Sequence, residues 1–179
     1  MITQKPMITL LVEENNPLSQ SFYNSCINSI QFHQLTCSCG HSGCLIIHGY
    51  YKRKVKSANG SFLLVVCRVK CTECGKTHAI LPSSIVPYSQ ISLTCCCQII
   101  ADLEGGADPC SVCDANPDID ENNVASVIRR FRKHWRQRLL SECIQMKPIR
   151  NLVISCFTHF SAQFLQIRRT VNRLYPKTT

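Results

Sequence analysis

The feature that most constrains the fold of this chain is Cys71-Thr-Glu-Cys74 followed directly by Gly75. A tight turn of this kind lets two thiolates converge on one metal ion, and the glycine tolerates the positive φ that the turn requires. A second cysteine cluster lies upstream, at residues 37–44, and the dipeptide Asn59-Gly60 between the two clusters is typical of a β-hairpin turn. Two cysteine clusters that flank a hairpin predict a zinc ribbon holding one structural Zn²⁺.

The upstream cluster is irregular. A Cys-x-x-Cys-Gly knuckle ending at Gly40 would need a cysteine where the chain has Thr36, and the spacing is Cys37-x-Cys39 instead. Any four of five cysteines would complete a tetrahedral site, and His41 is a less favoured ligand. The candidate ligands are Cys37, Cys39, Cys44, Cys71 and Cys74. A closed four-cysteine site is structural rather than catalytic, because no coordination position remains for a substrate. The alternative is a set of free structural thiols.

The chain has 14 cysteines among 179 residues, which raises the question of its redox compartment. Disulfide-dense proteins enter the secretory route through a signal peptide, but the apolar run 7–12 is short and is followed by Glu13 and Glu14. We therefore expect a cytoplasmic protein with reduced thiols. Three adjacent cysteines at 95–97 are expected to serve packing, and four more lie in apolar settings that favour the core. These four are Cys26, Cys67, Cys143 and Cys156.

Basic residues are concentrated late in the chain, which has a formal net charge of +9. Residues 129–138 contain six Lys or Arg, while residues 91–118 contain five acidic residues and no Lys or Arg. Phe131 and Trp135 interleave the basic residues at helical spacing, so they should face the core and leave a basic face exposed. Such a face suits nucleic-acid phosphates. The alternative is an ordinary solvated helix flank.

The elements around this run have the order of a helix-turn-helix. Helical periodicity predicts a helix over 92–104, a short helix over 109–114 after the cap Asp108, and a long helix that begins at Asp118 or Asp120 and runs to about Leu140. In a helix-turn-helix the first turns of the third helix reach base edges and later basic residues hold phosphates. The base-reading candidates are Asn122, Asn123, Ser126, Arg129 and Arg130, and the phosphate candidates are Arg132, Lys133 and Arg136.

A second basic patch lies on the ribbon hairpin beside Tyr50 and Tyr51. It consists of Lys52, Arg53 and Lys54 and is expected to contact a second stretch of DNA backbone. The alternative is a charged hairpin edge of the kind that prevents edge-to-edge pairing.

Together these patterns predict the α+β class: a small N-terminal zinc-ribbon β-hairpin domain followed by an all-α helix-turn-helix region. The expected segments are a strand and helix extension (1–36), the zinc ribbon (37–80), a linker (81–91), the helix-turn-helix (92–142) and a C-terminal helix, expected over 150–168, with a tail (143–179).

The ribbon also resembles a known family. The resemblance rests on the string CGHSGCLIIHGYYKR at 39–53, on Cys71-x-x-Cys74-Gly75-Lys-Thr-His-Ala, and on Leu-Pro at 81–82 with Val-Pro-Tyr at 86–88. These motifs are similar to those of uncharacterised small bacterial proteins in which a zinc ribbon precedes a helix-turn-helix, and to the N-terminal ribbons of several transposase families. The resemblance covers roughly residues 37–142. It implies DNA binding linked to mobile elements, with Cys71 and Cys74 as zinc ligands.

Catalysis is not expected. A transposase needs a nuclease domain with three metal-binding carboxylates, and no acidic residue lies beyond Glu142. The sequence thus predicts a non-catalytic, zinc-dependent DNA-binding protein that assists or regulates a mobile element. Its expected partner is double-stranded DNA, with no membrane and no small-molecule substrate; a homodimer, a transposase partner and a remnant of a longer transposase stay open. Two alternatives remain, an interaction adaptor and a thiol-redox protein using Cys110 and Cys113.

Overall fold

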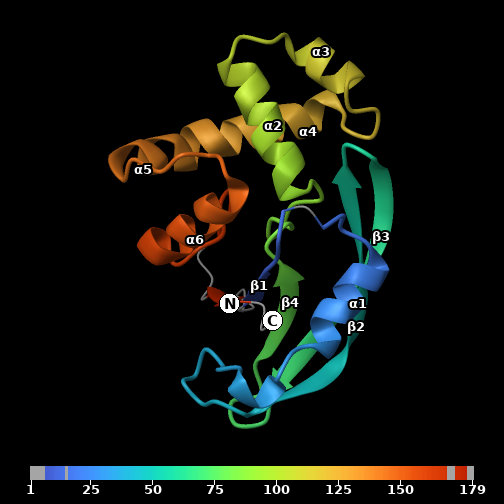
Figure 1. The fold of residues 1–179 in the computed structure, drawn as a ribbon, viewed down its shortest axis with the longest axis vertical. Coiled ribbons are helices and arrows are strands. Elements are labelled where there is room, and N and C mark those ends of the chain that lie inside the picture. Colours follow the sequence, from blue (N-terminus) through green and yellow to red (C-terminus); the bar gives the residue numbers. More distant parts are fainter. Residues whose placement is uncertain (1–6, 15, 169–171, 177–179) are drawn as a thin grey trace.

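A computed structural model describes residues 7–14, 16–168 and 172–176 of the chain (Figure 1). The strands are β1 (Met7–Leu11), β2 (Leu45–Ser57), β3 (Gly60–Cys71), β4 (Thr77–Pro82) and β5 (Asn172–Pro176). The helices are α1 (Gln20–Asn28), α2 (Leu93–Glu104), α3 (Pro109–Asp114), α4 (Glu121–Arg130), α5 (Arg136–Ser141) and α6 (Ile149–Phe160). A 3-10 turn, η1, covers Phe32–Gln34, and a π-helical segment, η2, covers Phe131–Trp135. Within the described ranges, no helix combines the length and the apolar character needed to cross a bilayer.

The strands form one mixed sheet in the order β2-β3-β4-β1-β5. The long β2–β3 hairpin and the β3–β4 pair are antiparallel, whereas β1 pairs in parallel with both β4 and β5. The expected fold class, a small β-hairpin domain followed by an all-α region, is therefore wrong. The hairpin is only one part of a five-stranded sheet that also takes in strands from near both ends of the chain.

The position of β1 explains its composition. Its five residues, MITLL, are all buried, because the strand lies between β4 and β5. A strand here was expected from the apolar run, but a run of this length does not identify its partners. The C-terminal helix is also shorter than its expected range of 150–168, since α6 ends at Phe160 and the chain returns to the sheet as β5.

Helix α1 makes hydrogen bonds to the part of β3 that does not pair with β4. The side-chain amide of Gln20 accepts a hydrogen bond from the Val65 amide (2.7 Å) and donates to the Val65 carbonyl (3.3 Å). Tyr23 bridges two strands: its hydroxyl accepts from the Cys67 amide (2.8 Å) and donates to the Ile80 carbonyl (2.9 Å). Two side chains thus satisfy backbone groups of β3 that would otherwise lack strand partners.

The Tyr23 bridge can be tested by Tyr23→Phe. The side chain is only 1% exposed, so the Cys67 amide and the Ile80 carbonyl would lose a partner away from water. We expect the free energy of unfolding, measured by urea titration, to fall by about 1–3 kcal/mol. The matched control is Tyr50→Phe, whose side chain is 60% exposed and which should change stability by less than about 0.5 kcal/mol. Equal effects of the two substitutions would contradict the bridging role.

The helical region follows the expected order, and the ranges of α2 and α3 confirm the sequence prediction. The helices α2, α3 and α4 each begin at a side-chain cap. Ser92 accepts from the Cys95 amide, Asp108 from the Cys110 amide and Asp120 from the Asn123 amide. These caps satisfy amides that have no partner within their helix. The predicted long third helix is present as α4, η2 and α5 in succession.

The π-helical segment has a cause in the spacing of apolar residues. Val127, Phe131, Trp135 and Leu139 recur at every fourth position and are all buried. In an α-helix of 3.6 residues per turn, each step of four residues rotates the side chain about 40° past a full turn. The wider π turn reduces this drift, so Phe131 and Trp135 stay on the face that packs against the rest of the helical core.

Most of the predicted core cysteines lie in the core. Cys26, Cys67 and Cys156 are buried, as is the run 95–97, which confirms a packing role for these thiols. The prediction for Cys143 is wrong: this residue is exposed and has a φ of 53° after the end of α5. None of the 14 cysteines forms a disulfide.

Candidate metal centre

Four of the five candidate ligands converge at the end of the β2–β3 hairpin. The sulfur atoms of Cys37, Cys39, Cys71 and Cys74 all lie within 4.8 Å of one another. The sulfurs of Cys37 and Cys74 are 3.5 Å apart, and those of Cys39 and Cys71 are 3.8 Å apart. Four thiolates bound tetrahedrally to Zn²⁺ at 2.3 Å would be separated by about 3.8 Å. The cluster can therefore hold one metal ion with little rearrangement.

Two loops of the same construction supply these ligands. In the downstream loop the Cys71 amide donates to the Lys76 carbonyl (2.9 Å), and the Gly75 amide donates to the Cys71 carbonyl (3.0 Å). In the upstream loop the Cys37 amide donates to the His41 carbonyl (2.8 Å), and the Gly40 amide donates to the Cys37 carbonyl (3.0 Å).

Both glycines have a positive φ, 70° at Gly75 and 100° at Gly40, which an L-residue would adopt only under strain. The upstream loop closes with the same pair of hydrogen bonds in one residue fewer. The spacing Cys37-x-Cys39 is thus a shortened form of the same loop.

The fifth candidate, Cys44, lies beside the cluster but outside the mutually close group. Its sulfur is 3.3 Å from that of Cys71 and 3.2 Å from the His41 carbonyl oxygen. His78, which was not predicted as a ligand, is buried beside the cluster, with its Nε2 3.2 Å from the Cys37 sulfur. Its position on β4, four residues beyond Cys74, was the only available signal. His41, the less favoured candidate, has Nδ1 at 3.4 Å from the Cys39 sulfur at the exposed rim.

The thiols of the cluster differ in acidity. Burial raises the pKa of the Cys37 thiol to about 12. Hydrogen bonds from the backbone and side chain of His41 lower the pKa of the Cys39 thiol to about 6. A bound divalent cation would favour the thiolate form at every ligand position. The cluster therefore has the donor atoms and the geometry of a metal site, with Cys39 already biased toward the charged form.

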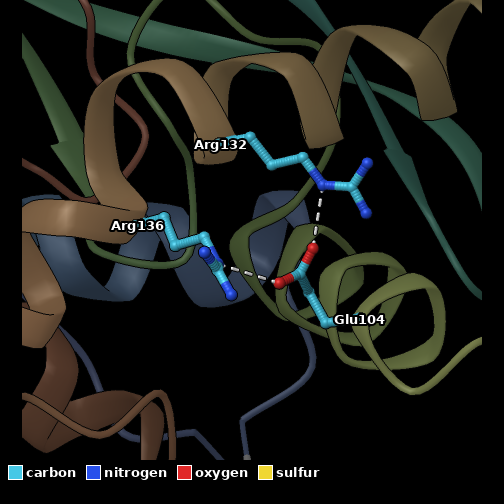
Figure 2. A network of polar contacts seen from close by, with 3 residues as sticks. All are labelled: Glu104, Arg132 and Arg136. Atoms are coloured by element: carbon cyan, nitrogen blue, oxygen red, sulfur yellow. Dashed lines mark hydrogen bonds and ion pairs between the residues drawn. The ribbon is translucent and has the colours of Figure 1, made fainter.

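The predicted base-reading and phosphate residues lie along α4, η2 and the first turn of α5. Asn122, Arg129, Arg132, Lys133 and Arg136 are exposed, while Asn123, Ser126 and Arg130 are half-buried. Arg132 and Arg136 share one partner that the sequence analysis did not assign to them, the carboxylate of Glu104 at the end of α2 (Figure 2).

The hairpin patch divides between its two faces. Lys52 and Lys54 are exposed, but Arg53 points the other way and donates to the carbonyls of Val86 and Ser89. Arg53 therefore fastens the segment after β4 to the hairpin.

A lysine next to the patch, Lys56, joins the hairpin to the basic helix, that is, the continuous run α4, η2 and α5. The Nζ of Lys56 lies 2.7 Å from Oδ1 of Asn123 and 3.5 Å from a carboxylate oxygen of Asp120. The turn of the hairpin consequently lies beside the N-terminus of α4, as Figure 1 shows. The hairpin turn and the start of α4, which are far apart in the sequence, are therefore neighbours, and Asn123 is engaged by Lys56.

The surroundings of the Cys110-x-x-Cys113 pair disfavour the thiolate form. The negative charge of Asp108 raises the pKa of the Cys110 thiol, and burial together with the charge of Glu121 raises that of Cys113. Reactive Cys-x-x-Cys thiols have a lowered pKa, because the thiolate is the nucleophile.

Comparison with known proteins gives one match. No curated protein and no solved structure matches the chain significantly. Residues 36–131, which span both loops of the cysteine cluster, the hairpin, α2, α3 and α4, match a family described as "Domain of unknown function (DUF6431)". Since the matched region covers more than half of the 179 residues, the chain belongs to the DUF6431 family.

Proposed function

We propose that this chain is a zinc-dependent, non-catalytic protein that binds double-stranded DNA. The observation that carries the proposal is the junction at Lys56, which brings the turn of the β2–β3 hairpin against the N-terminus of the basic helix. The cysteine cluster at the other end of the hairpin would fix its strands, and the helices α2, α3 and α4 have the order of a helix-turn-helix.

Zinc is the metal that fits the donor set best. Four thiolates in a compact, nearly tetrahedral arrangement favour Zn²⁺ or iron over the hard cations, which prefer oxygen ligands. With four protein ligands no coordination position is left for a substrate, so the ion would stabilise the fold rather than act on a substrate.

The DNA-binding surface would combine four exposed basic side chains. Lys52 and Lys54 lie on the hairpin, and Arg129 and Lys133 lie on the helix. None of the four has an ion-pair partner among the described residues. The resemblance of the ribbon to transposase N-terminal regions further supports a role as an accessory or regulatory protein of a mobile element.

DNA binding is tested by titrating a duplex at several salt concentrations. Because each phosphate contact releases counterions, four contacts predict that log K falls with log[salt] with a slope of about −3.6. The double variant R129A/K133A should flatten the slope by about 1.8.

The matched control for this titration is K76A/K147A, which removes the same charge from two exposed positions outside the proposed surface. It should leave the slope near that of the wild type. Absent or salt-independent binding would instead favour an interaction adaptor, and equal effects of the two double variants would contradict the assigned surface.

A further inference from the structure

The carboxylate of Glu104 is shared between two arginines of the basic helix. Its Oε1 accepts a hydrogen bond from Nε of Arg132 at 2.9 Å, and its Oε2 accepts from Nε of Arg136 at 3.1 Å (Figure 2). Glu104 is the last residue of α2, whereas the arginines belong to η2 and α5. One acidic side chain thus fixes two long basic side chains across a crossing of helices.

This arrangement leaves most of the hydrogen-bonding capacity of the arginines unused. Only Nε of each guanidinium donates a hydrogen bond to Glu104, and no described residue accepts one from the terminal nitrogens of either arginine. Both arginine side chains are 57% exposed, against 27% for Glu104. The cluster keeps one net positive charge and presents guanidinium edges of the kind that bind phosphate bidentately.

The π-helical segment contributes to this geometry. Arg132 and Arg136 are four residues apart, and each directly follows one of the buried aromatic residues Phe131 and Trp135. Because the wide turn keeps residues four apart nearly in line, the arginines stand one above the other and can share one carboxylate. The buried aromatic pair prevents the helix from rolling and so fixes where the arginines emerge.

A surface ion pair of this kind would ordinarily add little to stability. A more specific role follows from the unused guanidinium edges. We infer that Glu104 is a positioning residue that holds Arg132 and Arg136 as a paired clamp for one phosphate group of a nucleic-acid backbone. The clamp rests on the proposed DNA binding and adds to it a residue of opposite charge. Two pre-oriented arginines lose less side-chain entropy on binding than two free ones.

The test asks whether removing the negative charge of Glu104 raises or lowers the affinity for duplex DNA. Glu104→Gln makes the protein more positive by one charge, and counterion electrostatics alone predicts tighter binding of duplex DNA. Loss of the clamp geometry predicts weaker binding instead, and we expect the affinity of Glu104→Gln for duplex DNA to fall by about threefold to tenfold. The matched control is Asp102→Asn, in the same helix and with the same charge change, where Gln98 is the one described residue that bonds the carboxylate. This variant should bind as tightly as the wild type or slightly more tightly.

Weaker binding of Glu104→Gln could come from misplaced arginines or from a disturbed fold. The two causes are distinguished by repeating the substitution in an R132A/R136A background. There the substitution should no longer weaken binding, whereas a general loss of helix packing would weaken it in either background. Binding by Glu104→Gln that equals or exceeds that of Asp102→Asn would overturn the inference.

A second probe separates the clamp from the wider function. Inorganic pyrophosphate is titrated while the Nε–Hε signals of the arginines are followed by NMR. Shifts of the Arg132 and Arg136 signals in the wild type, lost in Glu104→Gln, would support the clamp even if no duplex DNA bound, in which case the proposed function alone would fail. If neither pyrophosphate nor duplex DNA moves these two signals, the clamp is overturned.

Discussion

Replacing Cys71 with serine is expected to abolish metal binding and to destabilise the end of the β2–β3 hairpin. Cys71 is fully buried at the last position of β3, where its sulfur lies near those of Cys39 and Cys44 and accepts a hydrogen bond from the Cys74 amide. Structural zinc contributes an apparent binding free energy of about 10–16 kcal/mol in zinc-finger peptides, and much of this is folding free energy. Metal content measured by mass spectrometry should fall from one ion per chain to nearly none, with a lower melting temperature by circular dichroism.

Two matched variants make this result specific. Cys67→Ala removes another fully buried thiol from the same strand, outside the metal cluster, and should keep the metal. Cys44→Ser should also keep the metal, because Cys44 lies outside the four mutually close sulfurs, whereas Cys39→Ser should lose it. Full metal content in Cys71→Ser would refute the centre, and loss of metal in Cys44→Ser together with retention in Cys39→Ser would reassign the ligand set.

The parts of this molecule that were predictable from the sequence depend on local chemistry. Cap residues such as Asp108 and Asp120 mark where helices begin, because their side chains bond amides two or three residues away. The convergence of the two cysteine loops was likewise predictable, since the Asn59-Gly60 turn between them forms a hairpin that sets Leu45 opposite Cys71.

The sheet was not predictable, because its decisive contacts are distant in sequence. β1 pairs with β5, with Met7 opposite Asn172, and neither five-residue segment carries a pattern that names the other. The segment NRLYP of β5 also lacks the regular alternation of a half-buried strand, so the C-terminal region was expected to hold only a helix and a tail. Parallel pairing between the two ends of the chain leaves no local signature.

The charge prediction for the basic run 129–138 was incomplete for the same reason, because its counter-charge is distant in sequence. The basic run 129–138 was expected to leave a free basic face, but Glu104 comes from another helix and pairs with two of its arginines. Contact with both arginines also lowers the pKa of the Glu104 carboxyl, so this carboxylate stays charged over the neutral range. A charge run in sequence therefore overstates the free positive charge on the folded surface.

Among substitutions in the helical core, Trp135→Ala is expected to lower the free energy of unfolding the most. Trp135 is 0% exposed, and its ring packs edge-on against Phe164 and Phe160 at centroid distances of 5.4 and 5.7 Å. Its Nε1 donates to the Gln166 carbonyl at 3.1 Å. Truncation should leave a cavity and lower the free energy of unfolding by about 3–5 kcal/mol. For a chain of this size that corresponds to a melting temperature lower by roughly 6–20 °C.

The measurement has to be circular dichroism, because Trp135 is the single tryptophan and the variant loses its fluorescence. Trp135→Phe is the matched control: it keeps an aromatic ring in the cluster and loses the bond to Gln166, so its cost should be clearly smaller. Trp135 belongs to the hydrophobic cluster of the helices, whereas Cys37 and Cys71 belong to that of the sheet, so Trp135→Ala should still bind one metal ion. A change in stability below about 1 kcal/mol would show that the aromatic cluster does not hold the π segment in place, and the alignment of Arg132 with Arg136 would then need another cause.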